Sequence, residues 1–169
     1  MKKNIIPVVL FISLICTSCA STMKTFENEV AFEGISFQLP ANWAAGAKRD
    51  GKSFFAIVGF DRADKETIFS IGCRSDKSWT MDEFFKRFQD SKTEIIREPV
   101  RQGKFGKYNC SLNRYQLVEN DKKVNGEILI FDDKGFYVVV IKQSLHGYDV
   151  QKVKYKLIED TFRINEVKK

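Results

Sequence analysis

The sequence contains a single histidine among its 169 residues. Sites that need two or three imidazoles, such as most catalytic zinc sites, are therefore excluded. Glycine and proline are also scarce, with ten and three residues, which excludes a collagen-like chain. Hydrophobic residues make up 43% and charged residues 30%, and this balance excludes a disordered chain and a polytopic membrane protein. The length accommodates one domain plus a tail.

The N-terminus has no apolar run of the roughly 20 residues that a membrane-spanning helix needs. Instead, Lys2 and Lys3 precede a mostly apolar run from Ile5 to Ile15, and small residues follow over 16–21. This order is typical of a secretory signal peptide. An uncleaved membrane anchor is the alternative, but Pro7 interrupts the apolar run and its continuation is small and polar.

The end of this segment resembles the lipobox of bacterial lipoproteins, in which a signal peptidase cuts before a cysteine that is then acylated. Cys19 fits this position because Ser18 before it is small, whereas Cys16 stands where the family prefers Leu. The resemblance implies a signal peptide over residues 1–18 and lipid attachment at Cys19. The alternative is an ordinary secretory signal that happens to contain a cysteine.

Lipid attachment would place the folded domain outside the cytoplasm, on a membrane of the cell envelope. Each buried CH₂ contributes about 0.8 kcal/mol, so two or three acyl chains hold a protein on a membrane without a spanning helix. Ala20, rather than Asp, follows the cysteine, and this resembles outer-membrane sorting more than inner-membrane retention. Cleavage would lower the net charge from +6 to +4, because it removes Lys2 and Lys3. No nucleic-acid partner is expected at so mild a charge.

After a tether over residues 19–29, residues 30–165 are predicted to form one α+β domain. Alternating apolar residues predict strands over 30–39 (a hairpin turning at Glu33 and Gly34), 54–60, 67–73, 95–100, 107–118, 124–131 and 136–142. The longest of these changes the parity of its apolar residues, which predicts a bulge near Asn113. The last two strands are apolar on both faces, and we expect helices to cover both faces of the sheet.

Two helices are predicted. Thr80 and Glu83 have the spacing of a capping box, with Trp79 and Phe84 placed as a hydrophobic staple. The Phe stripe of this helix (Met81, Phe84, Phe85, Phe88) indicates a core face more than a ligand groove. The second helix follows Asp149 as its cap. The expected buried stripe consists of Val150, Val153, Leu157, Thr161 and Ile164, with Ile158 and Phe162 beside it. Its basic face is either solvated or directed at anionic lipid heads.

The order of these elements carries a second resemblance. The first hairpin ends in Leu39-Pro40-Ala41-Asn42-Trp43, and the final helix runs into Asp160-Thr161-Phe162-Arg163-Ile164. Together with the strand pair, the capped helix and the long meander, this is similar to the PsbP/Mog-type α/β/α sandwich, which also occurs in bacterial lipoproteins such as the DcrB-like proteins. The resemblance covers about residues 30–165 and brings no catalytic signature, so it implies a fold and no activity.

Few residues suggest catalysis, and no cofactor or metal site is predicted. His146 precedes a glycine between the last strand and the last helix, and no nucleophile motif accompanies it. Asp132-Asp133 and the pair Asp61 and Asp64 lack the ligand spacing of a calcium loop. Asp132 and Asp133 are better explained by turn chemistry.

Two further features remain open. Cys73 and Cys110 would be left in an oxidising compartment after processing, where they are either bridged or free and buried. The basic, glycine-containing stretch 101–107 is predicted to be a loop. It lacks the ending of a phosphate-binding loop, and we interpret Arg101, Lys104 and Lys107 as a contact for a partner.

Three functional hypotheses follow. The first is a non-catalytic binding or accessory module of the envelope that contacts another protein. The second is a carrier of small ligands or lipids, whose apolar cavity would be lined by some of the 15 Phe residues. The third is an enzyme that uses carboxylates such as Asp132 and Asp133, which would have to converge in a cleft. The first is favoured because the core is ordinary and no catalytic constellation is visible.

Overall fold

A computed structural model of the chain describes residues 23–63, 67–86, 94–119, 122–145 and 147–165. The segment expected to be a signal peptide (1–18), Cys19, Asp64, Phe88 and His146 lie outside these ranges. Among the described residues, no helix has both the length and the apolar character required to cross a membrane.

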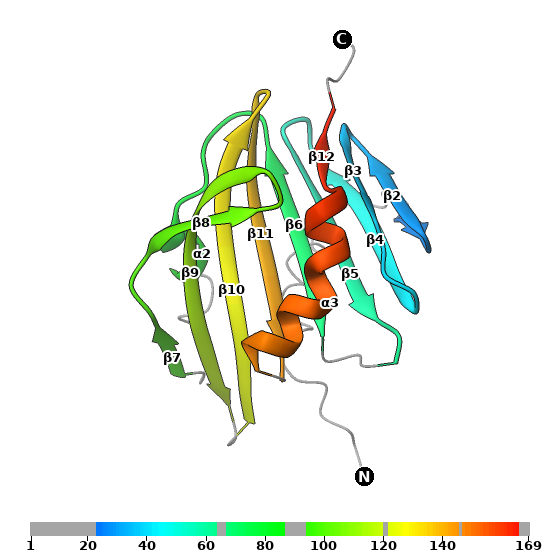
Figure 1. Cartoon of the computed structure of the whole chain (residues 1–169). Helices are drawn as coiled ribbons and strands as arrows, with labels where there is room; N and C mark the ends of the chain where they lie inside the picture. Colours follow the sequence, from blue (N-terminus) through cyan, green and yellow to red (C-terminus); the bar gives the residue numbers. More distant parts are fainter. Residues whose placement is uncertain (1–22, 64–66, 87–93, 120–121, 146, 166–169) are drawn as a thin grey trace.

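The described chain consists mainly of strands with two helices between them (Figure 1). The elements are β1 (Lys24–Phe26), β2 (Glu29–Phe32), β3 (Ile35–Gln38), β4 (Trp43–Asp50), β5 (Phe54–Asp61), β6 (Ile68–Arg74), α2 (Met81–Lys86), β7 (Glu94–Arg97), β8 (Arg101–Phe105), β9 (Tyr108–Glu119), β10 (Lys122–Asp133), β11 (Phe136–Ser144), α3 (Tyr148–Thr161) and β12 (Arg163–Ile164). The segment expected as a tether thus contains strand β1, which pairs with β4.

The strands form two antiparallel sheets. The large sheet has the order β1-β4-β5-β6-β11-β10-β9-β7, and β8 also pairs with β9. The small sheet has the order β12-β3-β2. Two hairpins turn at the predicted places through positive φ at both central residues, Glu33-Gly34 and Lys134-Gly135. Such turns match the twist of the flanking strands.

Two hydrophobic clusters cover opposite faces of the large sheet. The first cluster lies under α3 and the small sheet, and the second lies under α2. Strand β11 contributes to both, with Val138 and Val140 in the first and Val139 and Ile141 in the second. The prediction that this strand is buried on both faces is therefore confirmed.

The helices cover less of the sheet than predicted, although the α+β class is confirmed. Helix α2 has six residues, and α3 shares its face with the small sheet, whose Val30, Ile35 and Phe37 belong to the same cluster. In Figure 1, α3 lies in front of β5, β6 and β11. The small sheet therefore covers part of the large sheet that helices were expected to cover.

The capping box of α2 is confirmed. The backbone N–H of Glu83 donates to Thr80 Oγ1 at 3.1 Å, and the backbone N–H of Thr80 donates to Glu83 Oε2 at 3.2 Å. Lys77 donates to Glu83 Oε1 at 2.9 Å. These bonds hold the pKa of Glu83 below its usual value. Trp79 and Phe84 are both buried in the second cluster, as the staple requires.

Besides the short strands β1 and β12, two longer strands were not expected. Residues 101–105, predicted as a loop, form β8 along β9, with Phe105 fully buried at its end. Residues 43–50 form β4, although the segment is rich in Ala and Gly. Both strands depend on partners distant in sequence, and such pairing leaves little trace in local composition.

The predicted bulge in β9 is wrong. Its pairing with β10 is regular through Asn113, which lies opposite Ile128. The parity of its buried residues changes because different faces are covered along its length. Cys110 belongs to the first cluster, and Tyr115 belongs to the second. Regular strands can bury opposite faces at their two ends, since successive side chains alternate.

The predicted buried stripe of α3 is wrong at its centre. Val153 and Leu157 are 77% and 39% exposed, whereas Tyr155 is fully buried together with Ile158 and Phe162, which were expected beside the stripe. Ile164, the last residue of the predicted stripe, is buried in β12. The helix is thus rotated relative to the prediction, because the Tyr155 ring packs against Trp43 and its hydroxyl donates to two sheet carbonyls. Gly147 occupies the N-cap, so Asp149 lies inside the first turn and does not cap the helix.

Candidate functional site

A hollow of about 450 Å³ opens on the face of the sheet that α2 covers. Helix α2 forms one wall through Met81 and Phe85, and the connection from β7 to β8 forms the other through Pro99 and Val100. Asn113 of β9 lies between these walls. The capping box and the burial of Phe85 against Tyr115 (ring centroids 5.6 Å apart) position the helix wall.

Asn113 is the unusual residue of this hollow. It is 2% exposed, and its side-chain N–H donates to the backbone carbonyl of Glu98. Its Oδ1 is buried and has no hydrogen-bond partner within the ranges that the structure describes. Buried polar atoms are almost always paired, and each exception calls for an explanation. Sequence reasoning considered Asn113 only as a bulge.

Charged groups at the hollow compensate one another. The guanidinium of Arg97 lies 4.5 Å from the centroid of the Phe85 ring, and its Nη1 is 4.0 Å from Asp82 Oδ1. Glu98 also lines the hollow, but its Oε2 lies 3.3 Å from Nη2 of Arg101, which is not a lining residue and is the register partner of Leu112 on the other face of the sheet. Side chains of all four charged residues are substantially exposed. These pairs leave the hollow without an excess of either charge.

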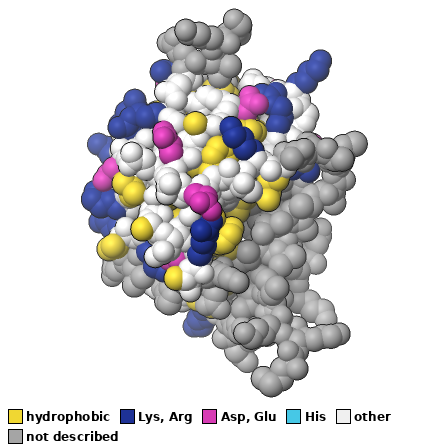
Figure 2. Space-filling model, turned by 90° about the vertical axis from the view of Figure 1, so that its right-hand side faces the viewer, with side chains coloured by type: hydrophobic (Ala, Val, Ile, Leu, Met, Phe, Trp, Pro, Cys, Tyr) yellow, Lys and Arg dark blue, Asp and Glu magenta, His cyan; other side chains and the backbone are white. Residues whose placement is uncertain are grey.

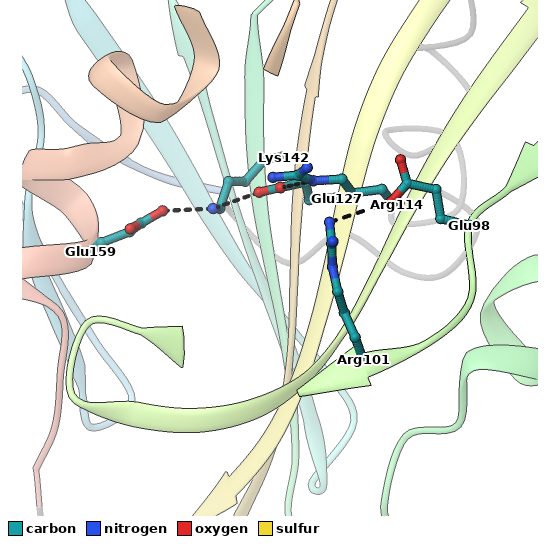
Figure 3. A network of polar contacts seen from close by, with 6 residues as sticks. All are labelled: Glu98, Arg101, Arg114, Glu127, Lys142 and Glu159. Atoms are coloured by element: carbon teal, nitrogen blue, oxygen red, sulfur yellow. Dashed lines mark hydrogen bonds and ion pairs between the residues drawn. The ribbon is translucent and has the colours of Figure 1, made fainter. Parts of the chain in front are cut away.

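A row of alternating charges crosses the opposite face of the sheet (Figure 3). Arg114, Glu127 and Lys142 are direct partners on β9, β10 and β11. Glu127 accepts from Arg114 Nε at 2.8 Å and from Lys142 Nζ at 3.1 Å. Lys142 also donates to Glu159 of α3 at 2.6 Å. Burial acts to raise the pKa of Glu127, but the two neighbouring cations together outweigh it and hold the pKa below its usual value.

This row connects α3 to the sheet. The Lys142 side chain is only 6% exposed, and its ammonium lies near the rings of Phe105 and Tyr155, at 6.0 and 5.7 Å. Two carboxylates, from Glu127 and Glu159, and these two rings thus surround the ammonium. A lysine so enclosed by compensating groups specifies how the helix docks.

The expected partner contact is divided between different places. Arg101 and Lys104 lie on β8 and Lys107 follows in the turn to β9, and all three are exposed. Arg101 pairs with Glu98, Lys107 lies 5.3 Å from the Tyr108 ring centroid, and Lys104 lines a second open hollow of about 380 Å³. All three side chains are therefore exposed but have different surroundings, and their role as a partner contact stays a prediction.

The two remaining cysteines are free and buried. Three strand spacings separate β6 from β9 in the sheet order, roughly 14 Å in all. A disulfide needs Cα atoms within about 7 Å, so the alternative of free thiols holds for Cys73 and Cys110. Burial raises the pKa of Cys73, and burial raises that of Cys110 to about 11.

The carboxylates proposed for an enzyme do not converge. Asp132 and Asp133 are adjacent on β10, opposite Tyr137 and Phe136, so their side chains alternate between the two faces. Within the described ranges, no group of three His, Cys, Asp or Glu residues is arranged to hold a metal ion. The phenylalanines mostly pack on one another, as Phe105 does on Phe162 at 5.1 Å.

The side of the molecule formed by the small sheet and β4 shows charges of both signs interspersed with scattered hydrophobic side chains (Figure 2). No block of a single charge stands out on this face. The exposed apolar side chains of Ile96 and Val100, 51% and 56% exposed, lie elsewhere, on and beside β7.

The comparison with solved structures identifies the fold. Cyanobacterial PsbP (CyanoP) from Synechocystis sp. PCC 6803 matches 88% of this chain and 98% of its own, with a TM-score of 0.57 and 12% identity. The fold is PsbP-like. A chain from Bacteroides thetaiotaomicron VPI-5482 matches at a TM-score of 0.56 and 13% identity; it covers 83% of this chain, which spans only about half (49%) of the Bacteroides one.

A third solved structure is more distant. LpqN, described as involved in cell envelope biogenesis of Mycobacterium tuberculosis, matches at a TM-score of 0.42 and 10% identity, covering 86% of this chain and 92% of its own. No protein-family model matches the chain, and no curated protein matches it. The match to CyanoP confirms the predicted resemblance to the PsbP-type fold. At these identities the PsbP-like fold brings no function with it.

Proposed function

We propose that the chain is an exported lipoprotein whose PsbP-like domain is a non-catalytic binding module for another envelope protein. The hollow between α2 and the connection from β7 to β8 carries this proposal. It combines exposed apolar surface at Val100 with a buried, unpaired acceptor at Asn113. Such a combination suits recognition, because a partner can bury the apolar surface and supply the missing donor.

The N-terminal sequence supports the address. Its charged start, apolar run and cysteine support acylation at Cys19. Strand β1 begins at Lys24, and five extended residues reach at most about 18 Å. The domain would therefore stay close to the membrane surface, and Ala20 would direct it to the outer membrane.

Palmitate labelling tests the anchor. The Cys19→Ala variant should lose the label and leave the membrane fraction, while the wild-type chain and a Cys73→Ala control keep both. Continued labelling of Cys19→Ala would overturn the anchor. Loss of the label from Cys73→Ala, with the label kept in Cys19→Ala, would mean that Cys73 and not Cys19 carries the acyl chain.

Capture from detergent-solubilised envelopes tests the binding function. The intact lipoprotein is used as bait beside Val100→Asp, which charges the hollow, and Ile96→Asp, which charges an equally exposed residue that does not line it. A partner lost with Val100→Asp and kept with Ile96→Asp supports the hollow. A partner lost only when Arg101, Lys104 and Lys107 are all replaced by Ala supports the basic contact instead. Turnover of an envelope substrate, abolished by a point substitution, would contradict a non-catalytic module.

A further inference from the structure

The unpaired Oδ1 of Asn113 defines what the hollow lacks. The side-chain N–H of Asn113 is satisfied by the carbonyl of Glu98, so the oxygen assignment follows from the bonding. The oxygen itself is buried without a partner among the described residues. An unsatisfied buried acceptor is costly, and a ligand that brings an N–H or O–H removes that cost. The ligand should therefore carry a hydrogen-bond donor.

The walls define the rest of the ligand. Met81, Phe85, Pro99 and Val100 present apolar surface, which favours an aliphatic group. The charged residues that line the hollow have partners: Arg97 pairs with Asp82, and Glu98 pairs with Arg101, which lies outside the lining. A charged ligand would have to break one of these pairs, so a neutral ligand fits better. The volume of about 450 Å³ lies within the range of small-ligand sites.

The hollow also lies beside the end of the sheet. Strand β7 is the last strand of the sheet order, and β9 is its one partner among the described strands. An edge strand offers backbone groups to an extended chain. Peptide backbone supplies the neutral N–H donors that the hollow lacks, and an aliphatic side chain supplies the apolar group.

We propose that this hollow binds an extended, neutral segment of a partner protein, with one aliphatic side chain between α2 and Val100 and one backbone N–H donating to Asn113 Oδ1. This inference rests on the proposed binding function and names the chemistry that the site recognises. Asn113 is among the residues that line the hollow, and the inference requires its buried Oδ1 to become reachable from there when the segment binds.

The three methionines of the chain make the site observable. Met81 lines the hollow, whereas Met23 lies against Gly46 at the opposite end of the sheet order and serves as an internal control. The full chain, labelled with ¹³C at the methionine methyls and held in detergent, is titrated with N-acetyl-leucine N′-methylamide. The matched probe is the same molecule with both amide nitrogens methylated, which removes the N–H donors and keeps the apolar group.

The Met81 methyl signal should shift saturably with the first probe while the Met23 signal stays in place. The donor-free probe should bind at least about fivefold more weakly, because it leaves Oδ1 unpaired. Val100→Asp should weaken binding of the first probe, and Ile96→Asp should not. A Met81 signal that does not move, equal binding of both probes, or equal effects of the two substitutions would each overturn the inference.

Failure of this inference is distinguishable from failure of the proposed function. If the probe does not bind but a captured partner is lost when Arg101, Lys104 and Lys107 are replaced, the chain is a binding module and the hollow is not its site. If the probe binds as expected and no envelope protein is captured, the hollow is a binding site, but the proposal that it binds a partner protein is contradicted.

Discussion

Glu127 and Lys142 face each other directly across β10 and β11, and their charged atoms lie 3.1 Å apart. The same register places Arg114 on the other side of Glu127. Helix α3 completes the row through Glu159, 2.6 Å from Lys142. Four charges of alternating sign thus cancel inside the protein, and they tie the docking of a helix to the register of three strands.

Removing the central cation should destabilise the fold. Lys142→Met keeps the length of the side chain but leaves Glu127 and Glu159 without their shared partner. Breaking a buried ion pair in this way costs about 3–5 kcal/mol. Urea unfolding at neutral pH measures the loss, with the exposed Lys104→Met as control. A loss as small as that of the control would contradict the structural importance of the row.

Neutralising the three most buried members of the row together should restore much of that stability. The triple variant Lys142→Met, Glu127→Gln, Glu159→Gln leaves only Arg114 charged, whose side chain is 34% exposed, and replacing a buried ion pair as a whole is often close to neutral. We expect its free energy of unfolding to lie well above that of Lys142→Met alone. A triple variant less stable than the single one would show that the loss comes from packing of the Lys142 side chain.

The same row should make the protein sensitive to acid. The pKa of Glu127 is lower in the folded state than its ordinary value of 4.5. Its ionised form therefore contributes stability above that value, and this contribution is lost as the pH falls through the folded-state pKa. Between pH 6 and 3, the free energy of unfolding should fall more steeply for the wild-type chain than for Glu127→Gln. Parallel pH profiles would contradict the assignment.

The Tyr115 ring packs so closely on Gly126 that no larger residue fits at this position. A Cβ at this position would lie 2.2–2.5 Å from atoms of the Tyr115 ring, and Tyr115 is itself 1% exposed and accepts from Gln143 at 2.8 Å. Gly126→Ala should therefore cost about 1–3 kcal/mol through overpacking. At Gly59 a Cβ meets its neighbours at ordinary distances of 3.6–3.7 Å, so Gly59→Ala is the control in thermal unfolding. Equal losses of stability in Gly126→Ala and Gly59→Ala would contradict the close contact between the Tyr115 ring and Gly126.

The buried thiols should react only after unfolding. Burial raises the pKa of both Cys73 and Cys110, and the thiolate is the reactive form. Iodoacetamide at neutral pH should leave both unmodified in the folded protein. In denaturant without reductant it should modify both, which intact-mass measurement detects. Modification in denaturant only after reduction would demonstrate a disulfide and contradict the sheet order.

Local patterns in the sequence were sufficient for several elements. The two hairpins turn at Glu33-Gly34 and Lys134-Gly135 because short, permissive turns lie between alternating strands. The capping box at Thr80 formed as expected, since both of its bonds are made within one turn. The burial of β11 on both faces followed from its composition. Each of these depends on residues that are close together in the chain.

The tertiary structure decided what depends on distant residues. Strands β4 and β8 exist because β5 and β9 pair with them, and α3 buries Tyr155 in place of Val153 because of the sheet beneath it. The spacing that keeps the two cysteines apart is likewise set by strand order. Asn113 became a candidate functional residue only when its surroundings showed an acceptor without a donor. Composition determined an α+β domain, whereas pairing between distant segments determined its site.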